Sequence, residues 1–386
     1  MVSQVLRGGV IEWDDVYNHH EIHRVLAGAM ADRHPAKRRQ VQQLMNFIND
    51  PLSLERLARG QIKPYPSRET PHPTGRMLMV PHLQEAALCG MLEGTLGAIL
   101  GGAGVRPSAF SASVYGVPKG CNSVAPASGP LQLLDRVTAK LREWPGAWVW
   151  RGDVAKAFNT IRPNLALEAL VRMLERVGWA LHVGVRRYLE GLLYGSRVLS
   201  RAHREPDWPT GIPTGNPLSP LLLGVVLDPL DRALEAALPG GSLYARFADD
   251  LVVLAQDQAS MQRLESTACS ALANLGLTLG ANKTATFPPG NPFPLMGFEV
   301  HGSRRQVPSA KVTDWAQRIA KAIGPDKTRR EHTRMVRGWM AYHRSGLTRD
   351  EARDVDRMVS RHLGRRFTIH RREWDSQKGG NQTSSA

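Results

Sequence analysis

Cysteine is scarce in this chain, with three residues among 386. Cys89, Cys121 and Cys269 are too scattered for a disulfide framework or for a zinc site, which needs closely spaced ligands. Long apolar runs are also missing. No stretch approaches the roughly 18 apolar residues of a membrane span, and the amino terminus has no apolar signal-peptide core. We therefore expect a protein of the reducing cytoplasm with no membrane span.

Acidic residues are the other shortage. The 35 Asp and Glu residues face 50 Lys and Arg residues, and the formal net charge is +15. The excess is concentrated in residues 301–386, where 20 basic residues meet 9 acidic ones. A chain this basic is expected to bind a polyanion. Nucleic acid is the first expectation, and an anionic membrane surface is the alternative.

The most informative stretch is Tyr244–Leu254, whose pattern predicts a strand, a sharp turn and a second strand. The second strand is an unbroken apolar run rich in β-branched residues, as a buried strand requires. Asp249 and Asp250 lie at the tip. An Asp pair in a turn is often only part of a solvated loop. Held between two buried strands, the pair concentrates negative charge and suits Mg²⁺, which binds carboxylates together with substrate phosphates.

A third carboxylate ends another apolar run, Trp148–Asp153. At the end of a buried strand, Asp153 could meet Asp249 and Asp250. The alternative is that Asp153 only caps the turn that follows, because Asp is a good helix N-cap.

The segment Gly211–Leu221 places a proline-containing turn between two glycines and before an apolar helix. Ser219 is predicted to be the N-cap of this helix, with Pro220 at the first helical position. A glycine-rich turn that leads into a helix N-terminus can bind an anion or pack against a base pair. The alternative is an ordinary loop before a core helix.

Most other segments have helical patterns, with residues 62–74 expected to be an extended, solvated connector. A turn that contains Tyr115 and Lys119 could approach a backbone phosphate closely. Three helices are predicted near the carboxyl terminus: 310–323, 327–343 and 349–363. The second mixes basic residues with aromatics, which suits a nucleic-acid groove.

Taken in order, these motifs resemble those of the reverse transcriptases, and within them the bacterial group II intron-like branch. The resemblance covers about residues 76–345. The segments that are similar to family motifs are Gly152–Phe158 (first catalytic palm motif), Gly211–Pro220 (Gly-Pro-Gln-Gly motif), Phe247–Asp250 (aromatic-x-Asp-Asp signature), Leu277–Lys283 and Leu295–Phe298 (the two following palm motifs) and Arg337–Tyr342 (thumb helix).

The resemblance implies an α+β, right-hand polymerase with fingers, an antiparallel-sheet palm with helices, and a helical thumb. The implied domains are an N-terminal helical extension (1–75), fingers (76–145), a palm (146–300, with a helical insertion at about 160–205), a basic helical thumb (301–372) and a disordered tail (373–386).

The implied activity is RNA-directed DNA synthesis with two Mg²⁺ ions, or Mn²⁺ as an alternative. Asp153, Asp249 and Asp250 would be catalytic and would bind the ions together with the Val154 carbonyl. The implied nucleotide-binding residues are Arg76, Phe158, Thr214, Gly215 and Lys283, although a plain surface lysine is the alternative for the last. The implied nucleic-acid-binding residues are Tyr115, Lys119, Arg334, Arg337, Trp339 and Arg344.

The implied partners are an RNA template or a structured non-coding RNA, the DNA product and dNTPs. A second copy of the chain or a partner protein is an open alternative. We expect a stand-alone bacterial enzyme that works with a partner RNA, with antiviral defence among the roles considered. The rival readings are an intron-type maturase or other RNA-binding protein, an RNA-dependent RNA polymerase, and a polymerase with altered template dependence. Thr214 stands where the family usually has Gln, so nucleotide contacts, fidelity or template use are expected to differ.

Phe158 stands where, by the resemblance, a bulky ring excludes a ribose 2′-hydroxyl. Phe158→Ala is therefore expected to raise rNTP incorporation relative to dNTP by about tenfold or more, the scale of one steric contact in a pocket. Primer extension with each nucleotide class measures this ratio. An unchanged sugar preference would remove Phe158 from the gate.

Overall fold

The computed structural model describes residues 9–17, 19–30, 35–65, 67–71, 77–102, 130–195, 211–322, 339, 342–347 and 349–362. The chain divides into two compact units. The first unit comprises Met1–Leu133 and Trp148–Thr286, and the second comprises Leu134–Ala147 and Phe287–Ala386. Helices and antiparallel sheets together confirm the α+β expectation.

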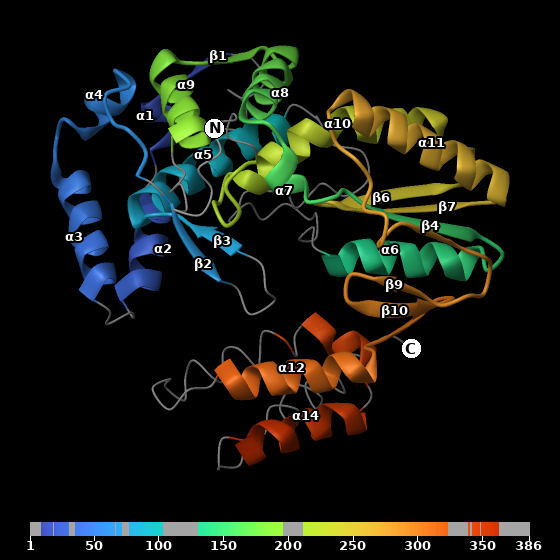
Figure 1. Ribbon diagram of the computed structural model, residues 1–386. Coiled ribbons are helices and arrows are strands. Elements are labelled where there is room, and N and C mark those ends of the chain that lie inside the picture. Colours follow the sequence, from blue (N-terminus) through green and yellow to red (C-terminus); the bar gives the residue numbers. More distant parts are fainter. Residues whose placement is uncertain are drawn as a thin grey trace, which may run out of the picture. The chain divides into compact units, whose positions relative to one another are not determined.

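A four-stranded sheet lies at the centre of the first unit, in the order β6-β7-β4-β8. Its strands are β4 (Trp148–Asp153), β6 (Leu243–Phe247), β7 (Asp250–Ala255) and β8 (Ala285–Phe287). β7 pairs antiparallel with both β4 and β6. Its apolar run Leu251–Leu254 is fully buried, which confirms the predicted strand. Helix α11 (Gln258–Asn274) packs on β4 and β7, and α10 (Ser219–Ala237) packs on α11 (Figure 1).

Helix α5 (Leu83–Gly102) of the first unit contacts α1, α2 and α3. Its side chains are apolar on nearly every face, so it is buried among its neighbours. The remaining helical elements are α1 (Trp13–Val16), α2 (His19–Met30), α3 (Pro35–Asn49), α4 (Ser53–Ala58), α7 (Ala157–Thr160), α8 (Pro163–Arg176), α9 (Val183–Glu190) and a π-helical turn, Gly191–Gly195.

Two small sheets were not expected from the sequence. β1 (Gly9–Ile11) pairs in parallel with β5 (Trp179–Leu181), and three-residue strands give too little periodicity to be read. β2 (Arg68–Pro71) pairs antiparallel with β3 (Met77–Val80). Residues 62–74, expected to be an extended connector, therefore include a strand that pairs with β3.

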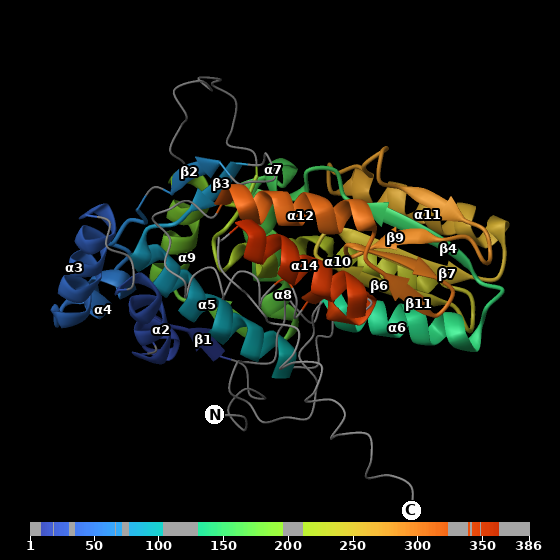
Figure 2. The ribbon, with the colours of Figure 1, turned by 90° about the horizontal axis from the view of Figure 1, so that it is seen from below.

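The second unit contains most of α6 (Pro130–Glu143). Its other elements are β9 (Phe293–Leu295), β10 (Phe298–His301), β11 (Arg304–Gln306), α12 (Ser309–Ala322), a 3₁₀ turn at Arg344–Gly346 and α14 (Arg349–His362). Figures 1 and 2 both show α12 and α14 side by side, and they are in contact. These two helices confirm the outer pair of the three predicted ones, whereas most of the middle one lies outside the described residues.

A buried polar chain ties α5 to the loop before α10. Glu85 accepts hydrogen bonds from the backbone N–H of Tyr65 (2.9 Å) and from the hydroxyl of Tyr188. Burial raises the pKa of Glu85 to about 7. One turn further along α5, the Sγ of Cys89 accepts a hydrogen bond from Asn216 Nδ2 (3.3 Å). The loop is thus anchored to the interior rather than free on the surface.

In the described part of the chain, no helix is both long and apolar enough to cross a membrane.

Two helical glycines predict opposite effects of adding one methyl group. A Cβ at Gly184 would overlap the carbonyl of Ala58 and lie 2.6 Å from the carbonyl oxygen of Leu57, whereas among the described residues no atom lies within 4 Å of a Cβ at Gly94. Gly184→Ala should lower the free energy of unfolding by about 1–3 kcal/mol because α4 and α9 must separate. The matched Gly94→Ala should raise it by about 0.5–1 kcal/mol. Denaturant unfolding of both variants tests this, and equal stabilities would contradict it.

Candidate active site

The turn between β6 and β7 consists of Ala248 and Asp249, and its backbone is unusual. Ala248 has φ +53, in the left-handed region, which costs a residue with a Cβ about 1–2 kcal/mol. Arg246 Nη1 donates a hydrogen bond to the Ala248 carbonyl (2.9 Å). The chain therefore reverses within two residues and presents Asp249 at a fixed position, as the strand–turn–strand prediction required.

The three predicted carboxylates lie at one end of the central sheet. Asp153 is the last residue of β4 and is the direct partner of Asp250 in the antiparallel register. The N–H of Val154 donates to the carbonyl of Asp249 (3.0 Å). The N-cap position before α7 is occupied by Lys156, so the alternative that Asp153 only caps this helix is wrong. The predicted convergence of Asp153 with Asp249 and Asp250 is confirmed at the level of the backbone.

The Asp249 carboxyl is in an environment that disfavours its negative charge. Burial raises its pKa first, and the nearby carboxylates of Asp153 and Asp250 raise it further, while Lys283 acts in the opposite direction. Like charges at the end of a buried sheet repel one another unless a cation is close. The position is therefore suited to binding a positive charge.

Two side-chain cations hold the other two carboxylates. Lys283 Nζ donates to Asp153 Oδ1 (2.6 Å), and Arg151 Nη2 donates to Asp250 Oδ1 (2.9 Å). The segment that carries Lys283 is pinned to β4, because the N–H of Gly280 donates to the Asp153 carbonyl (2.7 Å). Lys283 is thus a half-exposed lysine paired with Asp153, and its role toward a nucleotide stays a prediction. Arg151 was not anticipated, although its place two residues before Asp153 puts both side chains on one face of β4.

The donor set has the chemistry of a magnesium site. Carboxylate and carbonyl oxygens are the ligands that Mg²⁺ prefers. Within the described ranges, however, no three His, Cys, Asp or Glu side chains are gathered closely enough to hold a metal ion. Asp153 would have to turn from Lys283, and Asp250 from Arg151, to share one cation with Asp249. The metal-binding roles of these residues and of Val154 stay predictions.

The proline-containing turn before α10, which begins at Gly211, is held against β3. The N–H of Met79 donates to the carbonyl of Thr214 (2.8 Å) and also approaches its Oγ1 (3.3 Å). Gly215 has φ +93, and a Cβ there would lie 2.7 Å from the Met79 carbonyl oxygen, so this position requires glycine. Ser219 was wrongly predicted as an N-cap. It is the first helical residue of α10, and its hydroxyl donates to the Pro213 carbonyl (2.6 Å), which closes the loop.

Phe158 is joined to the same loop. Its carbonyl accepts a hydrogen bond from the N–H of Ile212 (2.7 Å), and its half-buried ring packs against the core. The carbonyl of Ile161 accepts one from the N–H of Gly211 (2.7 Å). The structure therefore links two separately predicted motifs, the one after β4 and the one before α10.

The predicted nucleic-acid contacts are tested little by the structure. Tyr115, Lys119, Arg334 and Arg337 lie outside the described residues, as does Arg76, which was predicted to bind the nucleotide, and only the backbone of Arg344 is described. In the second unit, Trp339 stacks on Trp315 and on His343, with ring centroids 4.1 and 4.3 Å apart.

A buried ion pair lies behind the acidic turn and was not predicted from the sequence. Arg246 and Asp231 are both fully buried, and the guanidinium of Arg246 donates to both carboxylate oxygens of Asp231 (2.7 and 2.5 Å). The hydroxyl of Tyr244 donates to the same carboxylate (2.7 Å). The available signal was Arg246 itself: a charge in a buried strand must have a buried partner. Its partner on α10 could not be identified without the fold.

Breaking this pair from one side should be costly. Asp231→Asn leaves a buried guanidinium without its counter-charge and should lower the free energy of unfolding by about 3–5 kcal/mol. The double variant Asp231→Leu/Arg246→Met removes both charges and should recover much of that loss. Arg232→Met is the control, because Arg232 is half exposed in its pair with Asp228 and should cost at most about 1 kcal/mol. Denaturant unfolding measures all three. A loss for Asp231→Asn no larger than that of the control would contradict the assignment.

Comparison with known families identifies most of the chain. The family "Reverse transcriptase (RNA-dependent DNA polymerase)" matches residues 95–300, which is more than half of the chain. The family "Group II intron, maturase-specific domain" matches residues 308–383. The predicted resemblance to reverse transcriptases of the group II intron-like branch is confirmed, and with it the right-hand polymerase fold.

Curated relatives are similar over shorter stretches. The retron Ec86 reverse transcriptase of Escherichia coli is 25% identical over 132 residues, which cover 34% of this chain and 40% of that protein. The retrovirus-related Pol polyprotein from type-2 retrotransposable element R2DM of Drosophila melanogaster is 35% identical over 116 residues, which cover 27% and 11%. The chain thus spans less than half the length of these relatives.

Among solved structures, telomerase from Candida albicans in complex with a TWJ fragment of telomeric RNA aligns with 84% of this chain and 59% of its own, at 12% identity and a TM-score of 0.49. Because the family match covers more than half of the chain, the chain belongs to the reverse transcriptase (RNA-dependent DNA polymerase) family.

Proposed function

We propose that this protein is an RNA-directed DNA polymerase that uses divalent metal ions for nucleotidyl transfer. The observation that carries the proposal is the register of the central sheet. It sets Asp153 directly opposite Asp250, with Asp249 at the tip of the adjoining turn, in a chain that belongs to the reverse transcriptase family.

Asp153, Asp249 and Asp250 would hold the ions, with the Val154 carbonyl as a further ligand, and Mg²⁺ or Mn²⁺ suits these oxygen donors. When bound, such ions supply Lewis-acid stabilisation of charge on the phosphoryl group. The chain's own cations have complementary tasks. Arg151 donates a 2.9 Å hydrogen bond to Asp250 and would offset its charge until a metal ion takes that place. Lys283 lies where it could give charge or a proton to a leaving pyrophosphate once it separates from Asp153.

Four residues are proposed to select the incoming dNTP. Phe158 would exclude the ribose 2′-hydroxyl, and Arg76 would contact the triphosphate. Thr214 and Gly215 would lie beneath the nascent pair. The hydrogen bond from the N–H of Met79 to the Thr214 carbonyl supports a loop that is held in place by backbone contacts.

The proposed nucleic-acid contacts comprise a set of basic and aromatic side chains: Tyr115, Lys119, Arg334, Arg337, Trp339 and Arg344. The basic residues 301–372 would form the thumb, residues 76–145 the fingers and residues 146–300 the palm. A partner RNA would serve as template or scaffold, with the DNA strand as product. We propose a stand-alone enzyme, with antiviral defence as the role to examine first.

A second candidate function is favoured by the match of residues 308–383 to the maturase-specific domain of group II intron proteins. In that case the chain would bind a structured intron RNA and assist its splicing. Sequencing the RNA and DNA that copurify with the protein separates the two. An intron RNA without complementary DNA favours the maturase function, and DNA complementary to a bound RNA favours the polymerase.

Asp249→Asn should abolish DNA synthesis while leaving RNA binding intact. The loss of one charged ligand removes several kcal/mol of transition-state stabilisation, so primer extension should fall by about a thousandfold or more. Asp14→Asn is the control, since Asp14 is an exposed carboxylate in α1, far along the chain from the site. Primer extension and RNA binding are measured in parallel. Full synthesis by the Asp249→Asn variant would refute the assignment.

A further inference from the structure

A hollow of about 520 Å³ lies wholly within the second unit, between α6, the turn of the β10–β11 hairpin and the 3₁₀ turn at Arg344–Gly346. Its volume lies within the range of about 300–1,000 Å³ that ligand sites occupy. None of the three carboxylates of the candidate active site belongs to this unit. The hollow is therefore a separate place on the chain with its own chemistry.

The walls of this hollow are tied together. Arg305 Nη1 donates to Asp135 Oδ1 (2.5 Å), which joins β11 to α6. The N–H of Val307 donates to the carbonyl of Gly346 (2.8 Å), which joins the segment after the hairpin to the 3₁₀ turn. The guanidinium of Arg305 also lies over the ring of Phe298, 5.9 Å from its centre. These contacts join α6 to β11 and the hairpin to the 3₁₀ turn, so the elements that carry the lining are held together.

The lining is rich in positive charge and in hydroxyl groups. Three arginines contribute to it, and Asp135, its one carboxylate, is already paired with Arg305. Arg142 and Arg304 are exposed, and neither has an ion-pair partner within the ranges that the structure describes. Ser303 and Ser345 add hydroxyl donors. Two unneutralised guanidiniums beside two hydroxyls form a donor set for phosphate oxygens.

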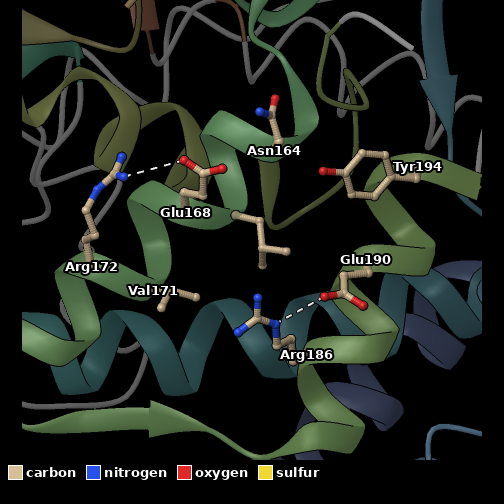
Figure 3. Close-up of a pocket in the computed structure, with 8 residues that line it drawn as sticks. Asn164, Glu168, Val171, Arg172, Arg186, Glu190 and Tyr194 are labelled. Carbon is tan, nitrogen blue, oxygen red and sulfur yellow. Dashed lines mark hydrogen bonds and ion pairs between the residues drawn. The ribbon is translucent and has the colours of Figure 1, made fainter. Parts of the chain in front are cut away.

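A second hollow, of about 490 Å³, shows how an arginine-lined surface looks when its charge is balanced. Figure 3 shows Arg172 beside Glu168 and Arg186 beside Glu190, and these pairs have N···O distances of 3.5 and 3.1 Å. Each arginine there has a carboxylate partner one helical turn away, so the two pairs contribute no net charge. The hollow in the second unit differs because Arg142 and Arg304 have no such partner among the described residues.

We propose that this second-unit hollow binds the phosphodiester backbone of a polynucleotide, with Arg142 and Arg304 as the phosphate contacts. Exposed charges contribute little singly, so a lone small anion would be held weakly. A polyanion engages several basic sites at once, and each contact then adds to one binding event. The surplus of basic residues over 301–386 makes such simultaneous contacts available. The proposal rests on the proposed function only for the class of ligand, a polynucleotide.

The test is the salt dependence of binding by the full-length chain. Fluorescence anisotropy with labelled single-stranded RNA and with DNA of the same sequence gives log K against log [NaCl]. The double variant Arg142→Gln/Arg304→Gln should make the slope shallower by about 1.4, the value for two lost phosphate contacts on a single strand. The control Arg172→Gln/Arg186→Gln removes the same formal charge from the balanced hollow and should leave the slope unchanged. Arg142→Lys/Arg304→Lys keeps the charge and should restore the slope.

A shallower slope with both RNA and DNA supports recognition of the phosphodiester backbone alone. A shallower slope with RNA only supports recognition of the backbone together with the 2′-hydroxyl. An unchanged slope, an equal change in the control, or no recovery in the lysine variant overturns the proposal. Binding is measured without catalysis, so failure of the proposed function can be told apart. If the wild-type chain copies no RNA but the Arg142→Gln/Arg304→Gln variant has the shallower slope, the polymerase proposal is overturned and the phosphate-binding proposal is kept. If the wild-type chain copies RNA but the variant has an unchanged slope, only the phosphate-binding proposal is overturned.

Discussion

The ion pair between Arg246 and Asp231 is the interaction on which the rest of the candidate site depends. Both side chains are fully buried, and in that environment the guanidinium can reach only groups at fixed positions. Two of its nitrogens bond Asp231 on α10, and the third bonds the Ala248 carbonyl in the turn. The pair therefore fixes β6 to α10 and holds the left-handed residue before Asp249. Because β7 continues from this turn, the position of Asp250 opposite Asp153 follows from it.

The carboxylates of Asp153, Asp249 and Asp250, unlike the buried pair, outnumber the side-chain cations that contact them. Strand register places three carboxylates at one end of the sheet, and like charges there repel one another unless a cation is close. Arg151 is paired with Asp250 and Lys283 with Asp153, whereas burial and the two neighbouring carboxylates raise the pKa of Asp249. A site built in this way favours a cation that can serve all three oxygen donors at once. This is the physical basis for proposing divalent metal ions here.

Much of this arrangement could be predicted from the sequence, because it follows from local patterns. The apolar run after Asp250 and the one before Asp153 fixed both strands, and their acidic ends could be expected to meet. Ion pairs and strand pairs between segments that are distant in the sequence could not be predicted. Periodicity does not say that Arg246 pairs with Asp231, that Arg151 holds Asp250, or that β1 pairs with β5. Ser219 was misassigned because its local pattern suits an N-cap, whereas the tertiary structure uses its hydroxyl to close the loop onto Pro213.

A structure of the full chain with an RNA–DNA primer–template, a non-hydrolysable dNTP and Mg²⁺ would test the central claim most directly. We expect two metal ions between the triphosphate and the carboxylates of Asp153 and Asp249, with Lys283 Nζ moved away from Asp153. Arg246 should remain bonded to Asp231 and to the Ala248 carbonyl. A bound nucleotide with no metal ion at these carboxylates, and with Lys283 still bonded to Asp153, would contradict it.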